Sequence, residues 1–205
     1  MELNKIIHAD CMDIMKDIPD KYFELAIVDP PYGIGANKEK PHNGWADYGI
    51  KQWDNKIPDK IYFNELFRIS KNQIIFGGNY FTMYLFPSMG WVFWDKGQRD
   101  FSLADGELLW TSFSRALRVF SFSRAKLIKE RGIHPTQKPI ALYRWLLQNY
   151  TKSGDKIIDT HSGSGSLAIA CHLEKFDFLA IEKDFDYWQA SVKRYETEIS
   201  QGKLF

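Results

Sequence analysis

The chain has 205 residues, of which 44% are hydrophobic and 26% are charged, and its formal net charge is +1. This length suits one domain with a full core, and this charge excludes a strongly basic nucleic-acid coat but not a local basic patch. The residues Met1 to Lys5 lack an apolar signal region, and no apolar run reaches membrane-spanning length, so a soluble cytoplasmic protein with no membrane partner is predicted. No metal site is expected, because the two cysteines lack ligand spacing and the histidines are scattered.

Strands and helices are predicted to alternate along most of the chain. Apolar runs predict strands at 5–8, 25–28, 73–76, 91–95, 107–111, 156–159 and 178–181. Helices are expected at 61–70, 79–86, 139–150, 165–174 and 185–199. The alternation indicates a mostly parallel sheet covered on both faces. The strands at 91–95 and 107–111 have no helix between them, which predicts an antiparallel edge.

The tetrad Asp29-Pro30-Pro31-Tyr32 directly follows the apolar strand at 25–28. Two prolines can neither continue a sheet nor enter a helix, so the chain must leave the strand as a stiff loop. The Asp29 carboxylate and the Pro30 carbonyl could accept both hydrogens of an exocyclic amine on adenine or cytosine. Those two hydrogen bonds would make the nitrogen lone pair available to attack a methyl group, while the Tyr32 ring stacks on the base. The plainer alternative is a Pro-Pro turn with a surface tyrosine.

Residues 33–60 form a long stretch that is rich in Gly, Asn, Lys and Trp and predicts no regular element. Loops of this length in compact domains are usually functional lids or disordered segments. Because it follows the tetrad, this loop is expected to lie over the active site. Trp45 is a candidate for stacking on a base, whereas most tryptophans belong to protein cores.

Residues 112–131 combine a short repeat with a cluster of basic side chains. Ser112 to Ala116 recurs as Ser121 to Ala125. Arginines interleaved with aromatic rings suit a nucleic-acid groove, where the cations neutralise phosphates and the rings stack on bases. The alternative is a two-stranded extension with one solvated, charged face, and both interpretations stay open. The basic residues here are Arg115, Arg118, Arg124, Lys126, Lys129 and Arg131.

A glycine turn, Gly163-Ser164-Gly165, lies between the strand at 156–159 and the helix expected at 165–174. Glycines at such a turn permit close approach of the backbone to a nucleotide. The strand at 178–181 then ends in Glu182, where an acid can hold ribose hydroxyls. The third glycine of the dinucleotide fingerprint is missing, which favours another adenosine-bearing cofactor over NAD.

Taken together, the chain resembles the DNA amino-methyltransferases that use S-adenosylmethionine to methylate adenine N6 or cytosine N4. Asp29 to Tyr32 matches their catalytic tetrad, Asp159 to Ser166 resembles their cofactor loop, and His134 to Pro139 matches a signature hexapeptide of one branch. The tetrad precedes the cofactor loop, which is the order of their β class. The resemblance covers nearly the whole chain. It implies a single-domain α/β, Rossmann-like fold with a seven-stranded, mostly parallel sheet.

The resemblance also implies contacts with the cofactor from three strand ends. In relatives an acid at the end of the first strand contacts the adenine amine, which points to Asp10, although this residue could instead cap a helix over 12–15. Asp159 is expected to meet the methionine amino group or to hold the loop. Glu182 is expected to hold the ribose.

The hexapeptide is expected to cover the methionine moiety, with Thr136 or Lys138 near its carboxylate. The plain alternative is a loop in which Pro139 begins the next helix. His161 stands where the family usually has phenylalanine, so the wall of the cofactor pocket is expected to differ. The remaining cofactor contacts implied by the resemblance are His134, Gly163, Ser164, Gly165 and Ser166.

Adenine is the expected target, because relatives acting on cytosine N4 more often carry serine in place of the tetrad aspartate. The alternatives are cytosine N4 methylation, a non-catalytic subunit that binds cofactor or DNA, and methylation of a free nucleotide or small amine. The expected partner is double-stranded DNA, and a homodimer, an endonuclease or a recognition subunit are further candidates. Because the segment 112–131 offers only about 20 residues for target recognition, it cannot form an independent domain.

Overall fold

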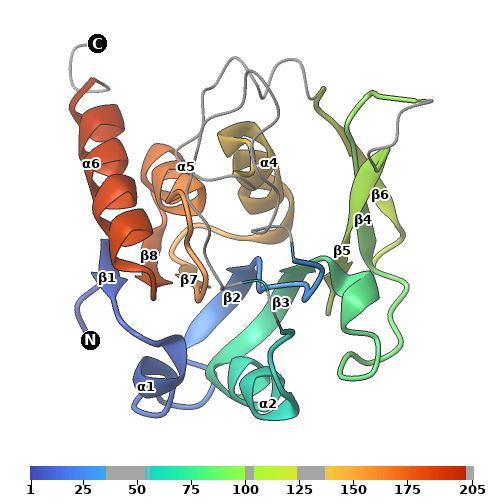
Figure 1. The fold of residues 1–205 in the computed structure, drawn as a ribbon, viewed down its shortest axis with the longest axis horizontal. Helices are drawn as coiled ribbons and strands as arrows, with labels where there is room; N and C mark the ends of the chain where they lie inside the picture. Colours follow the sequence, from blue (N-terminus) through green and yellow to red (C-terminus); the bar gives the residue numbers. More distant parts are fainter. Residues whose placement is uncertain (36–53, 55, 100–103, 124–136, 202–205) are drawn as a thin grey trace.

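The computed structural model describes residues 1–35, 54, 56–99, 104–123 and 137–201. Within them one eight-stranded sheet is covered by helices on both faces (Figure 1). Its strands are β1 (Lys5–His8), β2 (Phe23–Val28), β3 (Ser70–Phe76), β4 (Trp91–Asp95), β5 (Gly106–Thr111), β6 (Arg118–Ser121), β7 (Lys156–Asp159) and β8 (Asp177–Glu182). The helical elements are α1 (Cys11–Met15), α2 (Lys60–Ile69), the 3₁₀ turn η1 (Gly78–Tyr80), α4 (Ile140–Tyr150), α5 (Ser166–Glu174) and α6 (Phe185–Gln201).

The sheet has the strand order β1-β8-β7-β2-β3-β5-β4-β6. The five strands from β1 to β3 in that order are parallel to their neighbours, whereas β5 runs antiparallel to both β3 and β4. Strand β2 lies between β3 and β7, with Ala26 opposite both Gln73 and Ile158. The carboxyl ends of β2, β7 and β8 therefore open on one edge of the sheet, where ligands bind in open α/β folds.

The two faces of the sheet bury separate apolar cores, as the alternation of side chains along buried strands requires. Helices α4, α5 and α6 cover one face and α1 and α2 cover the other (Figure 1). Ile27 points into the first core with Leu146, while Ala26 and Val28 join Leu66 in the second. Each fully buried side chain of this size contributes about 1.5–3 kcal/mol. Burial on both faces fixes the position of β2, and with it the loop that follows.

Most of the predicted elements are confirmed within one to three residues at each end, but the helix predicted at 79–86 is wrong. Only the turn η1 forms there, and the carbonyl of Phe86 accepts a hydrogen bond from Trp110 Nε1 at 3.0 Å. Gly77 and Gly78 precede the segment and Pro87 follows it, so residues that disfavour a helix stand at both of its ends. Within this non-helical segment, Phe81 is buried in the core.

The predicted number of strands, seven, is also wrong, because β6 adds an eighth. It pairs in parallel with β4, with Phe93 opposite Val119, so the pair β4 and β5 is antiparallel as predicted but does not form the edge. The side chain of Val119 is 55% exposed. A strand this short and this exposed gives no strong alternating pattern in the sequence. Among the described helices, none combines the length and the apolar character needed to cross a membrane.

Candidate active site

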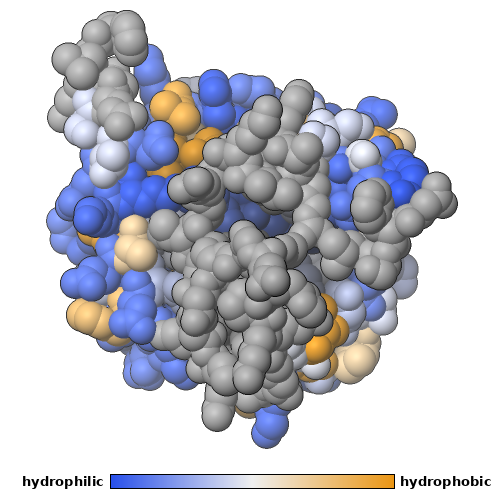
Figure 2. Space-filling view, turned by 45° about the horizontal axis from the view of Figure 1, so that its top comes forward, coloured by the Kyte–Doolittle hydropathy of each residue, from blue (hydrophilic) through white to orange (hydrophobic). Residues whose placement is uncertain are grey.

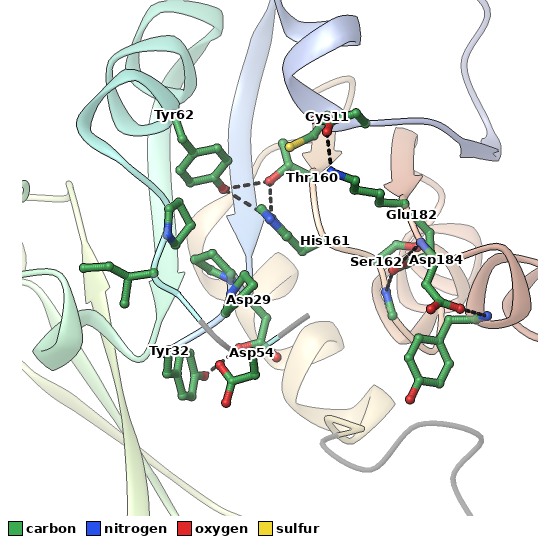
Figure 3. Close-up of a pocket in the computed structure, with 18 of the residues that line it drawn as sticks. Cys11, Asp29, Tyr32, Asp54, Tyr62, Thr160, His161, Ser162, Glu182 and Asp184 are labelled. Carbon is green, nitrogen blue, oxygen red and sulfur yellow. Dashed lines mark hydrogen bonds and ion pairs between the residues drawn. The ribbon is translucent and has the colours of Figure 1, made fainter. Parts of the chain in front are cut away.

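A cavity of about 830 Å³ lies at the carboxyl ends of β2, β7 and β8. This volume falls within the range of small-molecule and cofactor sites. The tetrad after β2 lines one part of the cavity, and the glycine loop after β7 lines another (Figure 3). Two motifs that are more than a hundred residues apart in the sequence therefore share one space. The sequence-predicted residues on its wall are Asp10, Asp29, Pro30, Pro31, Tyr32, Lys138, His161, Gly163, Ser164 and Glu182.

Asp29 is held by one hydrogen bond at each carboxylate oxygen. The Tyr32 hydroxyl donates to Oδ1 at 2.6 Å, and the Lys138 ammonium donates to Oδ2 at 2.6 Å. The Asp29 side chain is 16% exposed and that of Lys138 is 4% exposed. Each carboxylate oxygen has a second lone-pair site, so Asp29 can still accept further donors from the cavity. The contact between Lys138 and Asp29 was not predicted from the sequence, which pointed this lysine toward the cofactor.

Burial and pairing act in opposite directions on this ion pair. Burial raises the pKa of the Asp29 carboxyl above its ordinary value, and the Lys138 ammonium partly offsets that effect. Burial acts to lower the pKa of Lys138, but the carboxylates of Asp29 and Glu107 outweigh it and raise that pKa overall. Because the lysine stays protonated, it supports the charged form of a carboxylate that burial alone would neutralise.

The ring of Tyr32, the last residue of the tetrad, stacks on a neighbouring aromatic ring. Its centroid is 4.9 Å from that of Tyr80, with 12° between the ring planes, so Tyr80 covers one face. Gly77 lies against the same ring with a φ of +63°, and a Cβ at this position would overlap Tyr32. Only glycine adopts that backbone conformation without strain while leaving room for the ring. The aromatic side chain of the tetrad is thus fixed from β3 and η1 as well as from its own loop.

At the other end of the cavity, carboxylates hold the backbone of the glycine loop. Glu182 Oε2 accepts from the Gly163 N–H at 2.7 Å, and Oε1 accepts from the Asp184 N–H at 2.8 Å. Asp159 is buried and its Oδ1 accepts from the His161 N–H at 3.0 Å. The alternative in which Asp159 holds the loop therefore matches its observed contact. Burial raises the pKa of both the Asp159 and the Glu182 carboxyl groups.

His161 lies in a small polar cluster on the cavity wall (Figure 3). Its Nδ1 is 3.0 Å from the Thr160 hydroxyl, which is 2.7 Å from the hydroxyl of Tyr62. The Tyr62 ring packs edge-on to the imidazole, with 5.2 Å between the centroids. Burial lowers the pKa of His161 to about 4. The imidazole is therefore neutral near pH 7 and presents a flat, uncharged surface where the family usually has phenylalanine.

Asp10 caps α1, pairs with a lysine and lines the cavity as well. Its Oδ1 accepts from the Met12 N–H at 2.9 Å, and its Oδ2 pairs with Lys183 Nζ at 2.7 Å. The hydrogen bond with Lys183 lowers the pKa of the Asp10 carboxyl. The capping alternative is thus present, and the position on the wall keeps a contact with a bound adenine available.

Some predicted site residues are not on the cavity wall. Gly165 begins α5 in the left-handed conformation, and Ser166 is buried, with its hydroxyl accepting from Arg194 at 2.9 Å. Gly165 and Ser166 therefore support the conformation of the glycine loop without lining the cavity. The predicted site residues that lie outside the described part of the chain are Trp45, Arg124, Lys126, His134 and Thr136.

Sequence reasoning also missed several residues of the wall. Ser162 lies within the predicted cofactor loop, and its buried hydroxyl has no hydrogen-bond partner in the part of the chain that the structure describes. Its place between His161 and Gly163 was a usable signal. Tyr62 on α2 and Lys183 after β8 carry no such signal, because only the fold brings them to the cavity.

The candidate nucleic-acid residues are divided between two kinds of environment. Arg115 donates to the Asn149 carbonyl, and its guanidinium lies 4.8 Å from the centroid of the Tyr150 ring, so it packs back on α4. Arg118 is exposed on β6. Figure 2 shows one face of the molecule on which the described residues are mainly hydrophilic, with separate apolar patches.

Comparisons with known proteins identify the family of this chain. A model of the DNA methylase family of N6 and N4 methyltransferases matches residues 91–193, which include the hexapeptide and the cofactor loop. The chain belongs to this family. It is an S-adenosylmethionine-dependent DNA amino-methyltransferase. The family match does not include the tetrad. The assignment of Asp29 to the candidate site therefore rests on the geometry around it.

Individual relatives of this DNA amino-methyltransferase are distant. It is 23% identical to the Type II methyltransferase M2.MboI of Moraxella bovis over 93% of this chain and 86% of that protein. It is 22% identical to M.HpaI of Haemophilus parainfluenzae over 96% and 75% of the two chains.

Solved structures show the same fold. The complex of M1.HpyAVI with S-adenosylmethionine superimposes with a TM-score of 0.62 at 21% identity, covering 93% of this chain and 98% of that one. The cytosine-N4-specific PvuII DNA methyltransferase superimposes with a TM-score of 0.63 at 14% identity, covering 96% and 90%. The expected α/β methyltransferase fold is confirmed, and the choice between adenine and cytosine is not made by these likenesses.

The residues of the cavity fit S-adenosylmethionine. The Ser162 hydroxyl, which no described residue contacts by a hydrogen bond, offers a polar contact. The half-buried Glu182 carboxylate offers an acceptor for ribose hydroxyls, and the neutral imidazole of His161 offers a flat wall. The sulfonium is cationic, and the same space contains carboxylates at Asp29 and Asp10. A site of this composition favours a positively charged, adenosine-bearing cofactor.

Proposed function

We propose that this protein transfers the methyl group of S-adenosylmethionine to the N6 amine of adenine in double-stranded DNA. The observation that carries the proposal is the Asp29 carboxylate. It opens into the same cavity as the glycine loop and is aligned by Tyr32 and Lys138. The intact aspartate in the tetrad favours adenine over cytosine, since relatives acting on cytosine more often carry serine there.

In this proposal the tetrad supplies the acceptors for the target amine. Asp29 and the Pro30 carbonyl accept hydrogen bonds from its two N–H groups, so the nitrogen lone pair points to the methyl group, and one of these protons is released once the nitrogen is methylated. Tyr32 offers the ring face that Tyr80 does not cover as a stacking surface for the base. The cofactor, when bound, supplies an activated methyl group, so the protein needs no covalent nucleophile. Its work is alignment and electrostatic stabilisation of the charge that shifts during transfer.

The cofactor residues in this proposal come from the ends of β1, β7 and β8. Glu182 holds the ribose hydroxyls, and Asp10 reaches the adenine amine while it caps α1. Ser162 and the loop residues Gly163 and Ser164 line the nucleoside part. From the resemblance, Thr136 and His134 are also proposed to contact the cofactor. Gly165 and Ser166, which do not line the cavity, are proposed to support the loop.

A base inside a duplex cannot reach Asp29, so the proposal requires base flipping. Flipping costs a few kcal/mol, which stacking on Tyr32 and hydrogen bonds in the cavity would offset. Residues 33–60 are proposed to cover the substrate, and 112–131 to contact the DNA. A second copy of the chain, an endonuclease or a recognition subunit would complement so short a recognition segment.

The first test is methyl transfer to unmethylated duplex DNA, followed by digestion to nucleosides and mass spectrometry. The expected product is N6-methyladenine. N4-methylcytosine would overturn the choice of base and keep the role of Asp29. Cofactor binding without any methylated nucleoside, repeated with RNA and with free nucleotides, would favour a non-catalytic subunit and contradict the proposal.

A further inference from the structure

Four side chains of alternating charge run from the end of β4 to the tetrad. Lys96 Nζ is 2.7 Å from Glu107 Oε1, Glu107 Oε2 is 3.4 Å from Lys138 Nζ, and Lys138 Nζ is 2.6 Å from Asp29 Oδ2. Lys96 follows β4, Glu107 lies on β5, Lys138 precedes α4 and Asp29 follows β2. The ammonium of Lys138 is thus shared by two carboxylates. Neither the tetrad, the hexapeptide nor the cofactor loop accounts for Glu107.

The position of Glu107 is costly unless it serves Lys138. Its side chain is 20% exposed, and Oε2 is buried and makes no directed hydrogen bond with any residue that the structure describes. A carboxylate taken out of water costs several kcal/mol unless cations compensate for it. Lys96 and Lys138 provide that compensation from opposite sides. Burial acts to raise the pKa of Glu107, but these two ammonium groups outweigh it and lower that pKa overall, so the carboxylate is ionised.

We propose that Glu107 is a positioning residue for the methyl transfer, because it draws the Lys138 ammonium partly away from Asp29. The inference rests on the proposed role of Asp29 as acceptor for the target amine. An ammonium paired with Asp29 alone would neutralise it and weaken it as an acceptor. An ammonium shared with Glu107 still aligns Asp29, and its weaker pairing leaves acceptor strength on the carboxylate for the amine. Networks of this kind act as a unit, so their members have coupled effects.

The groups that act on Asp29 come from several elements. Lys138 favours its charged form, whereas Glu107 disfavours it, and the Tyr32 hydroxyl favours it through the hydrogen bond at Oδ1. Asp159 at the end of β7 interacts with Asp29 as a like charge. The phenols Tyr62 and Tyr143 also face the same space and are neutral, since burial raises the pKa of both well above its ordinary value.

This arrangement predicts shifts of opposite sign at Asp29. Removing the negative charge with Glu107→Gln is expected to lower the pKa of Asp29, because the Lys138 ammonium then acts on Asp29 alone. Removing the positive charge with Lys138→Met is expected to raise it. The measurement is the titration of the Asp29 carboxyl carbon by ¹³C NMR in the free protein, assigned with Asp29→Asn. No shift in Glu107→Gln, or a shift in the same direction as Lys138→Met, overturns the proposal.

If Glu107→Gln does not fold, Lys96→Met gives an independent test. It leaves Glu107 to pair with Lys138 alone, which draws the ammonium further from Asp29 and is expected to raise its pKa. An unchanged or lower pKa contradicts the proposal.

Kinetic measurements distinguish a positioning role of Glu107 from an effect of the substitution on folding. Because the substitution leaves Asp29 a weaker acceptor, Glu107→Gln is expected to lower kcat about tenfold, with KM for DNA and cofactor unchanged. The acidic limb of its pH profile should begin at lower pH than in the wild type. A lower kcat with an unmoved limb would indicate a merely structural role and overturn the proposal.

The matched control is Glu65→Gln, which removes a carboxylate 2.7 Å from Arg68 on α2, away from the cavity. It is expected to leave kcat, the acidic limb and the Asp29 titration unchanged. If the wild type transfers no methyl group, the proposed function fails, while the NMR titration still decides whether Glu107 shares Lys138.

Discussion

The two ends of the cavity are built in different ways. The proposed cofactor end is almost continuous in sequence, from β7 through the glycine loop to Glu182, and its carboxylates hold backbone N–H groups. The proposed catalytic end, around the tetrad, is assembled from side chains of distant segments, and its carboxylate holds a lysine and a tyrosine. The cofactor end therefore depends on loop conformation, whereas the catalytic end depends on a balance of charges. Substitutions at the two ends should fail in different ways.

The largest effect is expected from Asp29→Ala. Loss of the acceptor should reduce kcat by at least about 10³-fold, while the dissociation constant for S-adenosylmethionine stays within about threefold of the wild type. Single-turnover methyl transfer and isothermal titration calorimetry measure the two quantities. Near-normal turnover in this variant would remove Asp29 from the mechanism.

The opposite pattern is expected from Glu182→Ala. The Gly163 and Asp184 N–H groups lose their acceptor and the ribose loses its proposed partner, so the cofactor should bind about 10- to 100-fold more weakly. At saturating cofactor, kcat should recover to near the wild-type value. Equilibrium dialysis and kinetics at varied cofactor concentration provide the measurement. A loss of kcat that saturation does not restore would mean that the two ends are not separable.

A smaller effect is expected from Tyr32→Phe, which keeps the ring and its stack on Tyr80 but removes the hydrogen bond to Asp29 Oδ1. The loss in kcat should be about three- to tenfold, the range of one neutral hydrogen-bond donor. Tyr32→Ala, which also removes the ring, should lose more and should raise KM for DNA. Equal losses in the two variants would count against stacking on the base.

The smallest effect is expected from His161→Phe. Because burial lowers the pKa of His161 to about 4, the imidazole carries no charge from pH 6 to 8, and a phenyl ring can replace its flat surface. Cofactor affinity should change by no more than about threefold, with the same pH dependence in both proteins. The measurement is the dissociation constant at pH 6, 7 and 8. A difference that grows toward pH 6 would show that the histidine is charged when it acts.

More of the contacts at the proposed cofactor end than at the proposed catalytic end could be predicted from the sequence, because the residues of the cofactor end lie closer together in the chain. Gly163, Glu182 and the strands beside them are close in sequence, and each carries a local pattern. Asp29 and Tyr32 also have a local signature, but the contact of Lys138 with Asp29 joins residues 109 positions apart. Glu107 has no motif at all, and its role follows only from the place of β5 in the sheet.

The errors in the fold have a related cause. The segment 79–86 has the apolar spacing of a helix, yet its ends and the hydrogen bond from Trp110 to Phe86 prevent one. Strand β6 is short and exposed, so its residues carry no clear strand pattern. It is a strand because it pairs with β4. Both features depend on neighbours that a single sequence does not identify.

The ion pair between Asp29 and Lys138 also has a consequence for the way the protein folds. It closes a loop of 109 residues and spans β3, β4, β5 and β6. Contacts between residues so far apart form late, because the entropy of closing the loop must be offset before they contribute. The hydrogen bond from the Gly163 N–H to Glu182 joins residues only 19 positions apart, so it can form much earlier. During refolding, protection of the Gly163 amide from hydrogen exchange should therefore return before methyl transfer does.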